Sequence, residues 1–257
     1  MSTRIERAVI LAAGRGIRLM PLTADRPKPM IELAGRPLLE RVLRGLQAAG
    51  IREALVVLGY LGAVIRACFG DGDRIGLRLY YCDQQEKTGT AGALFPAESF
   101  CGSDPFLLHW GDILVDPANY PPLLERFAQR EPTCLLGVNW VADPCKGGAV
   151  YRDGERILEI VEKAPAGSAT TLWNNGGIVG FSHRLWPYLQ RTPPSHTGEY
   201  YLTDTINLLA GAGERVLAYE INGDRVHITS PEDVAALQGD PRILRWEQTL
   251  AALSKAA

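Results

Sequence analysis

Residues 8–30 read AVILAAGRGIRLMPLTADRPKPM, and this stretch decides the fold. Its apolar start, residues 8–11, predicts a buried strand of a parallel sheet. Two glycines follow, and a glycine-rich loop after a strand leaves main-chain N–H groups free to bind phosphate oxygens. The same stretch places positive charge at this loop through Arg15, Arg18 and Lys28. The stretch therefore predicts a site for a polyanionic ligand.

Two common phosphate-binding loops do not match this stretch. A dinucleotide fingerprint needs a third glycine where Leu19 stands. A P-loop ends in Gly-Lys followed by Ser or Thr, and that ending is absent. A lone Gly-x-Gly is also common in ordinary turns between a strand and a helix. The remaining positions of the stretch must therefore decide its role.

The composition is that of a globular protein: the 257 residues are 46% hydrophobic and 22% charged. A net charge of −2 provides no basic field for nucleic acid. No apolar run approaches the ~20 residues that a membrane span needs, and the N-terminus lacks the apolar core of a signal peptide. The five cysteines are scattered, which favours reduced thiols. We therefore expect a cytoplasmic protein that binds neither nucleic acid nor membrane.

Strand-like and helix-like segments alternate through the first half of the chain. Strands are expected at 54–58, 77–81 and 106–108, and helices at 36–49, 61–69 and 116–128. The second half favours further strands, at 133–141, 149–152, 156–162, 172–181 and 216–221. This order predicts a single α/β domain on a Rossmann-like sheet, mixed but mostly parallel, with helices on both faces.

The positions between Gly14 and Pro29 complete a longer pattern, Gly-x-Gly-x-Arg-x-x-Pro-x-Thr followed by Pro-Lys-Pro. In this the chain resembles the sugar-1-phosphate nucleotidylyltransferases, and further motifs extend the resemblance to about Val234. The resemblance implies the nucleotide-diphospho-sugar transferase fold. It also implies a reaction between a nucleoside triphosphate and a sugar 1-phosphate that yields an NDP-sugar and pyrophosphate. The single domain 1–257 would comprise a nucleotide-binding lobe (about 1–130), a sugar-binding lobe (about 131–240) and a C-terminal helix (241–257).

The nucleotide side of the site follows from the same resemblance. Arg18 would hold the β- and γ-phosphates, and Lys28 would bridge the α-phosphate and the incoming phosphate. The residues expected to bind the nucleotide are Leu11, Ala13, Gly14, Gly16, Gln84, Gly89 and Thr90. The last three lie in QQEKTGTAGAL at 84–94, which resembles the family's base-recognition loop. An amide can pair with both donor and acceptor edges of a base. The resemblance implies dTTP or UTP, because thymidylyl- and uridylyl-transferring members carry Gln at the position of Gln84, whereas many guanylyl-transferring members carry Glu.

Three later motifs resemble the sugar-binding elements of the family: EKAP at 162–165, NNGGI at 174–178 and GEYYLTD at 198–204. They supply the expected sugar-phosphate ligands Glu162, Lys163, Asn175, Gly177 and Glu199. The two glutamates would contact sugar hydroxyls, Lys163 would bind the phosphate, and the other two would line the sugar pocket. Ala164 interrupts the family's Glu-Lys-Pro, so the local turn can differ.

The expected metal site departs from the family. Asp112 follows the apolar run 106–108, and a carboxylate at the carboxyl end of a parallel strand faces the ligand crevice. Mg²⁺ suits such a site, because it takes one or two carboxylates together with phosphate oxygens. Where the family's pattern Trp-x-Asp places a second metal-binding aspartate, RVH at 225–227 places His227. Asp224 is close in sequence, but its strand parity points it to the other face.

Three interpretations of His227 remain open. In the first, Asp112 and phosphate oxygens alone bind the metal, and His227 donates a hydrogen bond to a phosphate. In the second, His227 is a ligand of Mn²⁺ or a similar ion, and in the third, catalysis is impaired. We favour an active enzyme with Asp112 and His227 at the metal. The other two functions compatible with the sequence are a nucleotide-sugar-binding regulatory subunit and a cytidylyltransferase for a non-sugar phosphate. The chain could form a homo-oligomer with any of these three functions.

Overall fold

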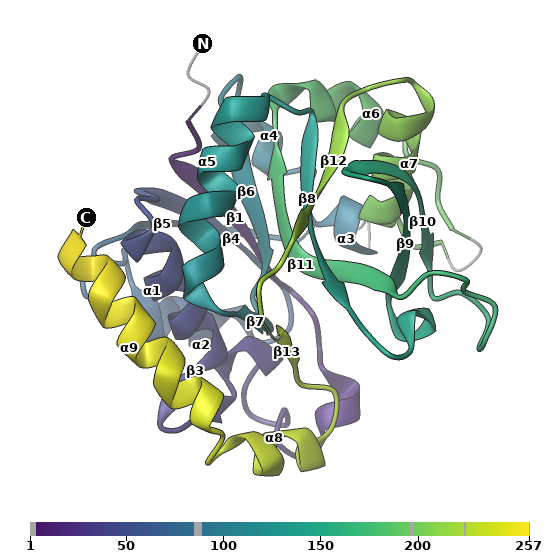
Figure 1. Cartoon of the computed structure of the whole chain (residues 1–257). Helices are drawn as coiled ribbons and strands as arrows, with labels where there is room; N and C mark the ends of the chain where they lie inside the picture. The colour runs from purple at the N-terminus through teal and green to yellow at the C-terminus, as the bar shows by residue number, and fades with distance from the viewer. Residues whose placement is uncertain (1–3, 85–88, 196–197, 224, 257) are drawn as a thin grey trace.

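The computed structural model describes residues 4–84, 89–195, 198–223 and 225–256 (Figure 1). Nine strands of this part of the chain form one sheet in the order β5-β4-β1-β6-β11-β8-β12-β10-β9. Their bounds are β1 Arg7–Ala12, β4 Glu53–Leu58, β5 Arg78–Asp83, β6 Phe106–Trp110, β8 Cys134–Trp140, β9 Gly148–Asp153, β10 Arg156–Glu162, β11 Trp173–Phe181 and β12 Val216–Glu220. One sheet thus runs through both predicted lobes.

Strand β1 lies inside the parallel part of the sheet. It pairs in parallel with β4 on one side and with β6 on the other, and β4 pairs in parallel with β5. Antiparallel pairing begins where β11 joins β6 and predominates beyond it, apart from the parallel pair β8 and β12. Because β1 and β6 run in the same direction, the loops that follow them leave the same edge of the sheet.

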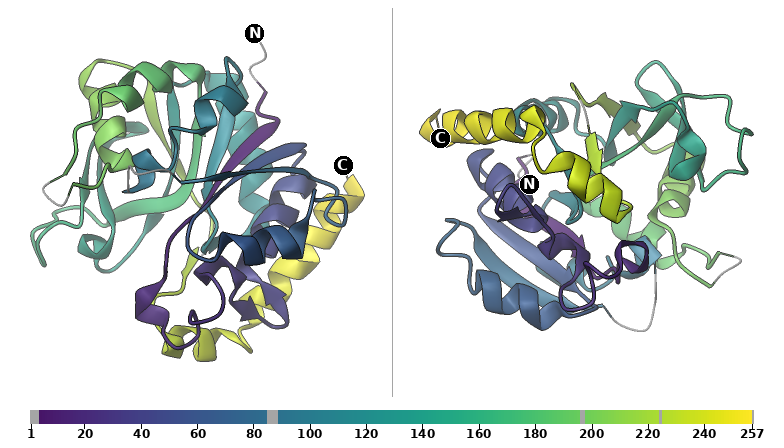
Figure 2. Two further views of the ribbon diagram at one scale, coloured as in Figure 1. Left: turned by 180° about the vertical axis from the view of Figure 1, so that it is seen from behind. Right: turned by 90° about the horizontal axis from the view of Figure 1, so that it is seen from below.

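Helices cover both faces of the sheet (Figures 1 and 2). The first face carries α1 Leu38–Ala48, α2 Gly62–Phe69, α5 Tyr120–Arg130, α8 Pro231–Leu237 and α9 Pro241–Ala256. The second carries α3 Gly89–Gly92, α4 Ala97–Cys101, α6 Trp186–Gln190 and α7 Leu202–Gly211. Along β1 the residues alternate between the two cores: Ile10 packs in the first and Val9 in the second. The predicted α/β fold class is confirmed.

Several short elements were not predicted from the sequence. Strands β7 Ile113–Val115 and β13 Arg225–His227 form a small antiparallel pair, and β2 Glu32–Leu33 pairs with β3 Arg36–Pro37. The short 3-10 turns are η1 Ile17–Leu19, η2 Lys28–Met30, η3 Pro117–Asn119, η4 Pro144–Lys146 and η5 His183–Leu185. The expected helix at 116–128 begins as η3 and continues as α5. Among the described residues no helix is long and apolar enough to cross a membrane.

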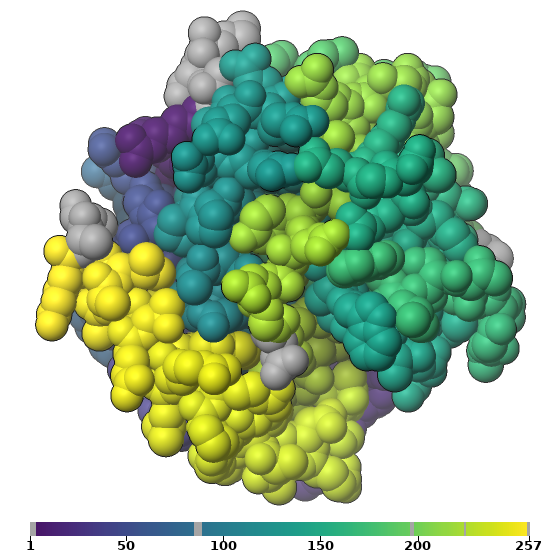
Figure 3. All heavy atoms as spheres, viewed as in Figure 1, coloured from purple at the N-terminus to yellow at the C-terminus, as the bar shows by residue number. Residues whose placement is uncertain are grey.

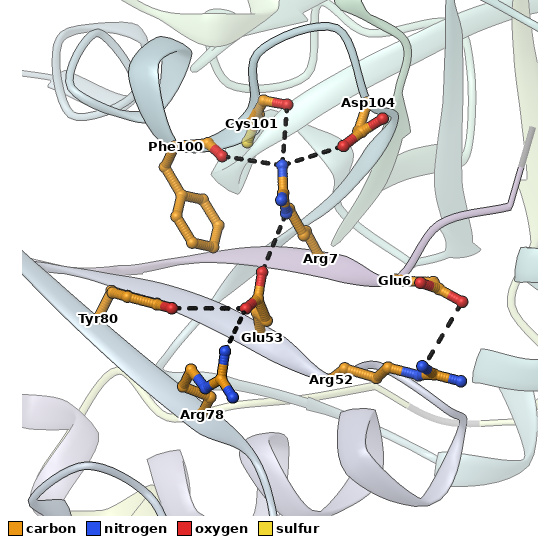
Figure 4. A network of polar contacts seen from close by, with 9 residues as sticks. All are labelled: Glu6, Arg7, Arg52, Glu53, Arg78, Tyr80, Phe100, Cys101 and Asp104. Atoms are coloured by element: carbon orange, nitrogen blue, oxygen red, sulfur yellow. Dashed lines mark hydrogen bonds and ion pairs between the residues drawn. The ribbon is translucent and has the colours of Figure 1, made fainter. Parts of the chain in front are cut away.

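A polar network fastens the amino ends of the parallel strands (Figure 4). The Arg7 guanidinium at the start of β1 lies 3.1 Å from the Glu53 carboxylate at the start of β4 and 3.0 Å from that of Asp104. It also donates to the main-chain oxygens of Phe100 and Cys101 in α4. The network therefore joins the amino ends of β1 and β4 to the segment that leads into β6.

Candidate active site

The loop after β1 carries Lys28 back to the end of β6. Lys28 begins η2 and is only 8% exposed. Its Nζ lies 2.5 Å from Oδ2 of Asp112, the second residue after β6. Gly16 makes this path feasible, because its φ is +64° and a Cβ there would lie 3.0 Å from Cβ of Lys28. The structure therefore brings together two residues that the sequence assigned to one site.

Gly111 places the Asp112 carboxylate. Its main-chain N–H donates to the Leu11 oxygen at 2.9 Å, and a Cβ at Gly111 would lie 3.2 Å from that oxygen. Burial raises the pKa of Asp112, but the charge of Lys28, and that of His227 when it is protonated, lower it, so that the pKa lies below its ordinary value. The group is therefore a carboxylate at neutral pH and is available to cations.

His227 enters the site through the pairing of β13 with β7. It is the register partner of Ile113, the residue after Asp112. Its Nε2 lies 3.3 Å from Lys28 Nζ and 4.0 Å from Asp112 Oδ2. Burial, followed by the charge of Lys28, lowers the pKa of His227 to about 4. The imidazole is therefore neutral near pH 7, and Nε2 accepts a hydrogen bond, because an ammonium can only donate. Asp224, the weighed substitute, lies outside the described residues.

Arg225 also belongs to this cluster, and the sequence analysis missed it. It lies two residues before His227 on β13, so both side chains share one face of the strand, while Val226 between them is buried in the core. The Arg225 guanidinium donates from Nη1 to the Asn175 oxygen. Burial lowers the pKa of Arg225, and the nearby Asp112 charge opposes that shift. The alternation of a strand was the signal that could have found Arg225.

The other residues of the glycine loop border this cluster. Arg18 is exposed in η1, and its charge contributes to the low pKa of His227. Gly14 has open space on its Cβ side, with no atom within 4 Å. Ala13 accepts a main-chain bond from Tyr60 at 3.2 Å, and the Arg15 guanidinium lies over the Tyr60 ring. Arg18 is thus near the Lys28 cluster, whereas Arg15 is held by the neighbouring loop.

The predicted base-recognition loop is tied to the start of α7. Gln84 Nε2 donates to the Gly89 oxygen at 3.3 Å, and Gly89 has φ +89°, where an added Cβ would lie 2.4 Å from the Tyr200 main-chain oxygen. The Thr90 hydroxyl accepts from the Leu202 N–H at 2.9 Å. Thr90, expected to bind nucleotide, therefore also joins two helices. Residues 85–88 of this loop lie outside the described residues.

Four of the predicted sugar-binding residues form two separate hydrogen-bonded groups. Tyr201 joins Lys163 to Glu199: its hydroxyl lies 3.3 Å from Lys163 Nζ and donates to Glu199 Oε2 at 2.7 Å. Asn175 Oδ1 accepts from the Gly177 N–H at 2.9 Å. Tyr201 was not predicted from the sequence.

Glu162 lies at the end of β10, beside Gly148. Burial raises the pKa of Glu162, and the adjacent Lys163 charge opposes this shift. A half-buried carboxyl group of this kind is suited to accept hydrogen bonds from sugar hydroxyls.

The donor set limits how a metal can bind. Among the described residues no group of three or more His, Cys, Asp or Glu side chains is placed to hold an ion. Asp112 and His227 together supply one carboxylate and one neutral imidazole. Mg²⁺ is bound in proteins by one or two carboxylates plus phosphate oxygens and waters. The residues therefore fit a divalent cation that shares its coordination with substrate phosphates.

Comparisons with known proteins show the family and the fold of the chain. A family model described as "Nucleotidyl transferase" matches residues 7–247. The chain is 33% identical to the UTP–glucose-1-phosphate uridylyltransferase AglF of Haloferax volcanii, over 88% of this chain and 93% of AglF. It is 32% identical to a glucose-1-phosphate thymidylyltransferase of Streptomyces griseus, over 84% of this chain but 61% of that protein. The UDP-glucose pyrophosphorylase structure from Acinetobacter baumanii shares the fold, with TM-score 0.79, 23% identity and coverage of 97% and 99% of the two chains.

Proposed function

The chain belongs to the nucleotidyl transferase family, and from this premise we propose that it transfers a nucleotidyl group from a nucleoside triphosphate to a sugar 1-phosphate. The products are an NDP-sugar and pyrophosphate. The contact between Lys28 and Asp112 at 2.5 Å carries the proposal, because it joins the phosphate-binding loop to a carboxylate able to hold a cation.

The reaction requires the alignment of two anions. An oxygen of the sugar phosphate attacks the α-phosphorus, a new P–O bond forms, and the bond to the β-phosphate oxygen breaks as pyrophosphate leaves. No general base is needed, since the attacking phosphate is ionised at neutral pH. The protein's contribution is positioning and charge stabilisation, which together account for most catalysis of this type.

Three cationic residues of the site would bind the substrate phosphates. Lys28, held at the carboxyl edge of the sheet, would bridge the α-phosphate and the incoming phosphate. Arg18, exposed in the loop, would bind the β- and γ-phosphates and stabilise the leaving group. Lys163, steadied by Tyr201, would anchor the sugar phosphate from the opposite side.

Asp112 and His227 would hold a divalent cation, with Mg²⁺ as the first candidate and Mn²⁺ as the alternative. When bound, the cation neutralises part of the phosphate charge. The low pKa of His227 keeps its imidazole in the form that binds a cation. When no phosphates are bound, the Asp112 carboxylate forms an ion pair with the Lys28 ammonium. Substrate phosphates would therefore compete with Asp112 for Lys28.

The base is proposed to be uracil or thymine. Gln84 lies at the end of β5 with an amide that offers both a donor and an acceptor. AglF is named as using UTP, and the Streptomyces griseus relative is named as a thymidylyltransferase. Both names also specify glucose 1-phosphate, which makes that sugar phosphate the first to test.

A pyrophosphate-release screen tests the proposal. UTP, dTTP, GTP, CTP and ATP are each combined with glucose, mannose and N-acetylglucosamine 1-phosphates and with phosphocholine, in Mg²⁺ or Mn²⁺. We expect release with UTP or dTTP and a hexose 1-phosphate. Release with CTP and phosphocholine alone would favour the cytidylyltransferase. Nucleotide-sugar binding without release from any pair would favour the regulatory subunit.

A further inference from the structure

Arg225 is a charged residue next to the proposed reaction centre, and no described acidic side chain pairs with it. Among the residues that the structure describes, its guanidinium makes one hydrogen bond, to the main-chain oxygen of Asn175, and forms no ion pair. A guanidinium carries five N–H donors, so most of its hydrogen-bonding capacity remains available. A half-buried cation with spare donors is a binding site for an anion.

The position of Arg225 indicates which anion this is. On one side it lies within electrostatic range of Asp112 and His227, where the metal and the α-phosphate are proposed to bind. On the other side it contacts Asn175, a proposed wall of the sugar pocket. The group that lies between an α-phosphate and a sugar in this reaction is the phosphate of the sugar 1-phosphate.

The sequence of β13 adds a charge argument. In the family pattern Trp-x-Asp, Arg225 occupies the tryptophan position and His227 the aspartate position. Both residues face the crevice, so this chain has gained one cation and lost one carboxylate there. Within the part of the chain that the structure describes, Asp112 is the carboxylate close to both Lys28 and Arg225, and a site with two cations and one carboxylate favours an additional anion.

We propose that Arg225 binds the phosphate of the sugar 1-phosphate and presents it to the α-phosphorus. The hydrogen bond to the Asn175 oxygen orients the guanidinium. Its remaining N–H groups donate to two oxygens of the phosphate. This inference rests on the proposed function, because it assigns a residue to one substrate of that reaction.

Steady-state kinetics of Arg225→Gln test it, with the nucleotide and sugar phosphate varied separately. We expect the KM for glucose 1-phosphate to rise at least ~10-fold, the scale of one lost charge-assisted hydrogen bond. The KM for UTP should stay within about twofold. Arg225→Lys should restore part of the loss, because it keeps the charge but not the planar fork. Arg184→Gln, the same change at an exposed arginine paired with Glu214, should leave both constants unchanged.

The outcomes separate the inference from the proposed function. If the wild type releases no pyrophosphate from any pair in the screen, both fall together. If the wild type is active and Arg225→Gln raises both KM values equally, or raises only that for UTP, the inference alone is wrong. A loss of kcat with unchanged KM values in both Arg225 variants would also overturn it, because Arg225 would then only hold Asn175. Thermal unfolding of each variant checks that it is folded.

Discussion

The Lys28 ammonium lies 2.5 Å from the Asp112 carboxylate and 3.3 Å from the His227 imidazole nitrogen. The three residues come from the loop after β1, the end of β6 and the short strand β13. One cation therefore lies between both proposed metal ligands before any substrate binds. This arrangement leads to the following predictions.

Removing either phosphate-binding cation should nearly abolish turnover. We expect Lys28→Ala and Arg18→Ala each to lower kcat/KM at least ~100-fold, the usual scale for an electrostatic catalytic group. Lys146→Ala is the control, because Lys146 is exposed and pairs only weakly with Asp143, at 3.6 Å. Pyrophosphate release close to the wild-type rate in either folded variant would remove these residues from the mechanism.

Changing the amide of Gln84 should alter the choice of base. Gln84→Glu replaces a side chain that donates and accepts with one that only accepts. An unpaired base edge costs about 1–3 kcal/mol when buried, so kcat/KM for dTTP or UTP should fall about 5- to 150-fold. Competition among the triphosphates measures this. An outright preference of the wild type for GTP would show that the pyrimidine assignment is wrong.

Replacing His227 should change the choice of metal. His227→Asp adds a second carboxylate next to Asp112, and two carboxylates suit Mg²⁺ better than one carboxylate and an imidazole. The variant should bind Mg²⁺ more tightly, and the wild type should show the larger preference for Mn²⁺. Metal titrations followed by calorimetry measure both. Identical metal dependence in the two proteins would place His227 outside the metal site.

Gly177 should be needed for stability as well as for the sugar pocket. Its φ is +84°, and a Cβ would lie 2.6 Å from Cδ1 of Ile113. Gly223 has nearly the same φ, +82°, but no atom within 4 Å. Gly223→Ala therefore measures the backbone strain alone, about 1 kcal/mol. Gly177→Ala should lower the free energy of unfolding by a further ~1–3 kcal/mol, because it also overpacks the contact with Ile113. Equal losses in urea unfolding would mean that Ile113 moves aside freely.

The sequence predicts the parts of the site that depend on long strands. The loop of Lys28 and the Asp112 motif each follow an apolar run, and parallel strands bring such loops to one edge. Strand alternation places Arg225 and His227 on one face, but their position beside Asp112 depends on the pairing of β13 with β7, which joins segments far apart in the sequence. Tyr201 was missed for another reason: its link between Lys163 and Glu199 joins residues from different elements, which no local pattern records.

The most direct test of the account is to identify both products of one reaction by phosphorus NMR. The wild-type protein is incubated with UTP or dTTP, glucose 1-phosphate and Mg²⁺, and Lys28→Ala is incubated in parallel. The account predicts equal amounts of NDP-glucose and pyrophosphate from the wild type, and almost none of either from Lys28→Ala. Release of orthophosphate in place of pyrophosphate, or pyrophosphate without an NDP-sugar, would contradict it.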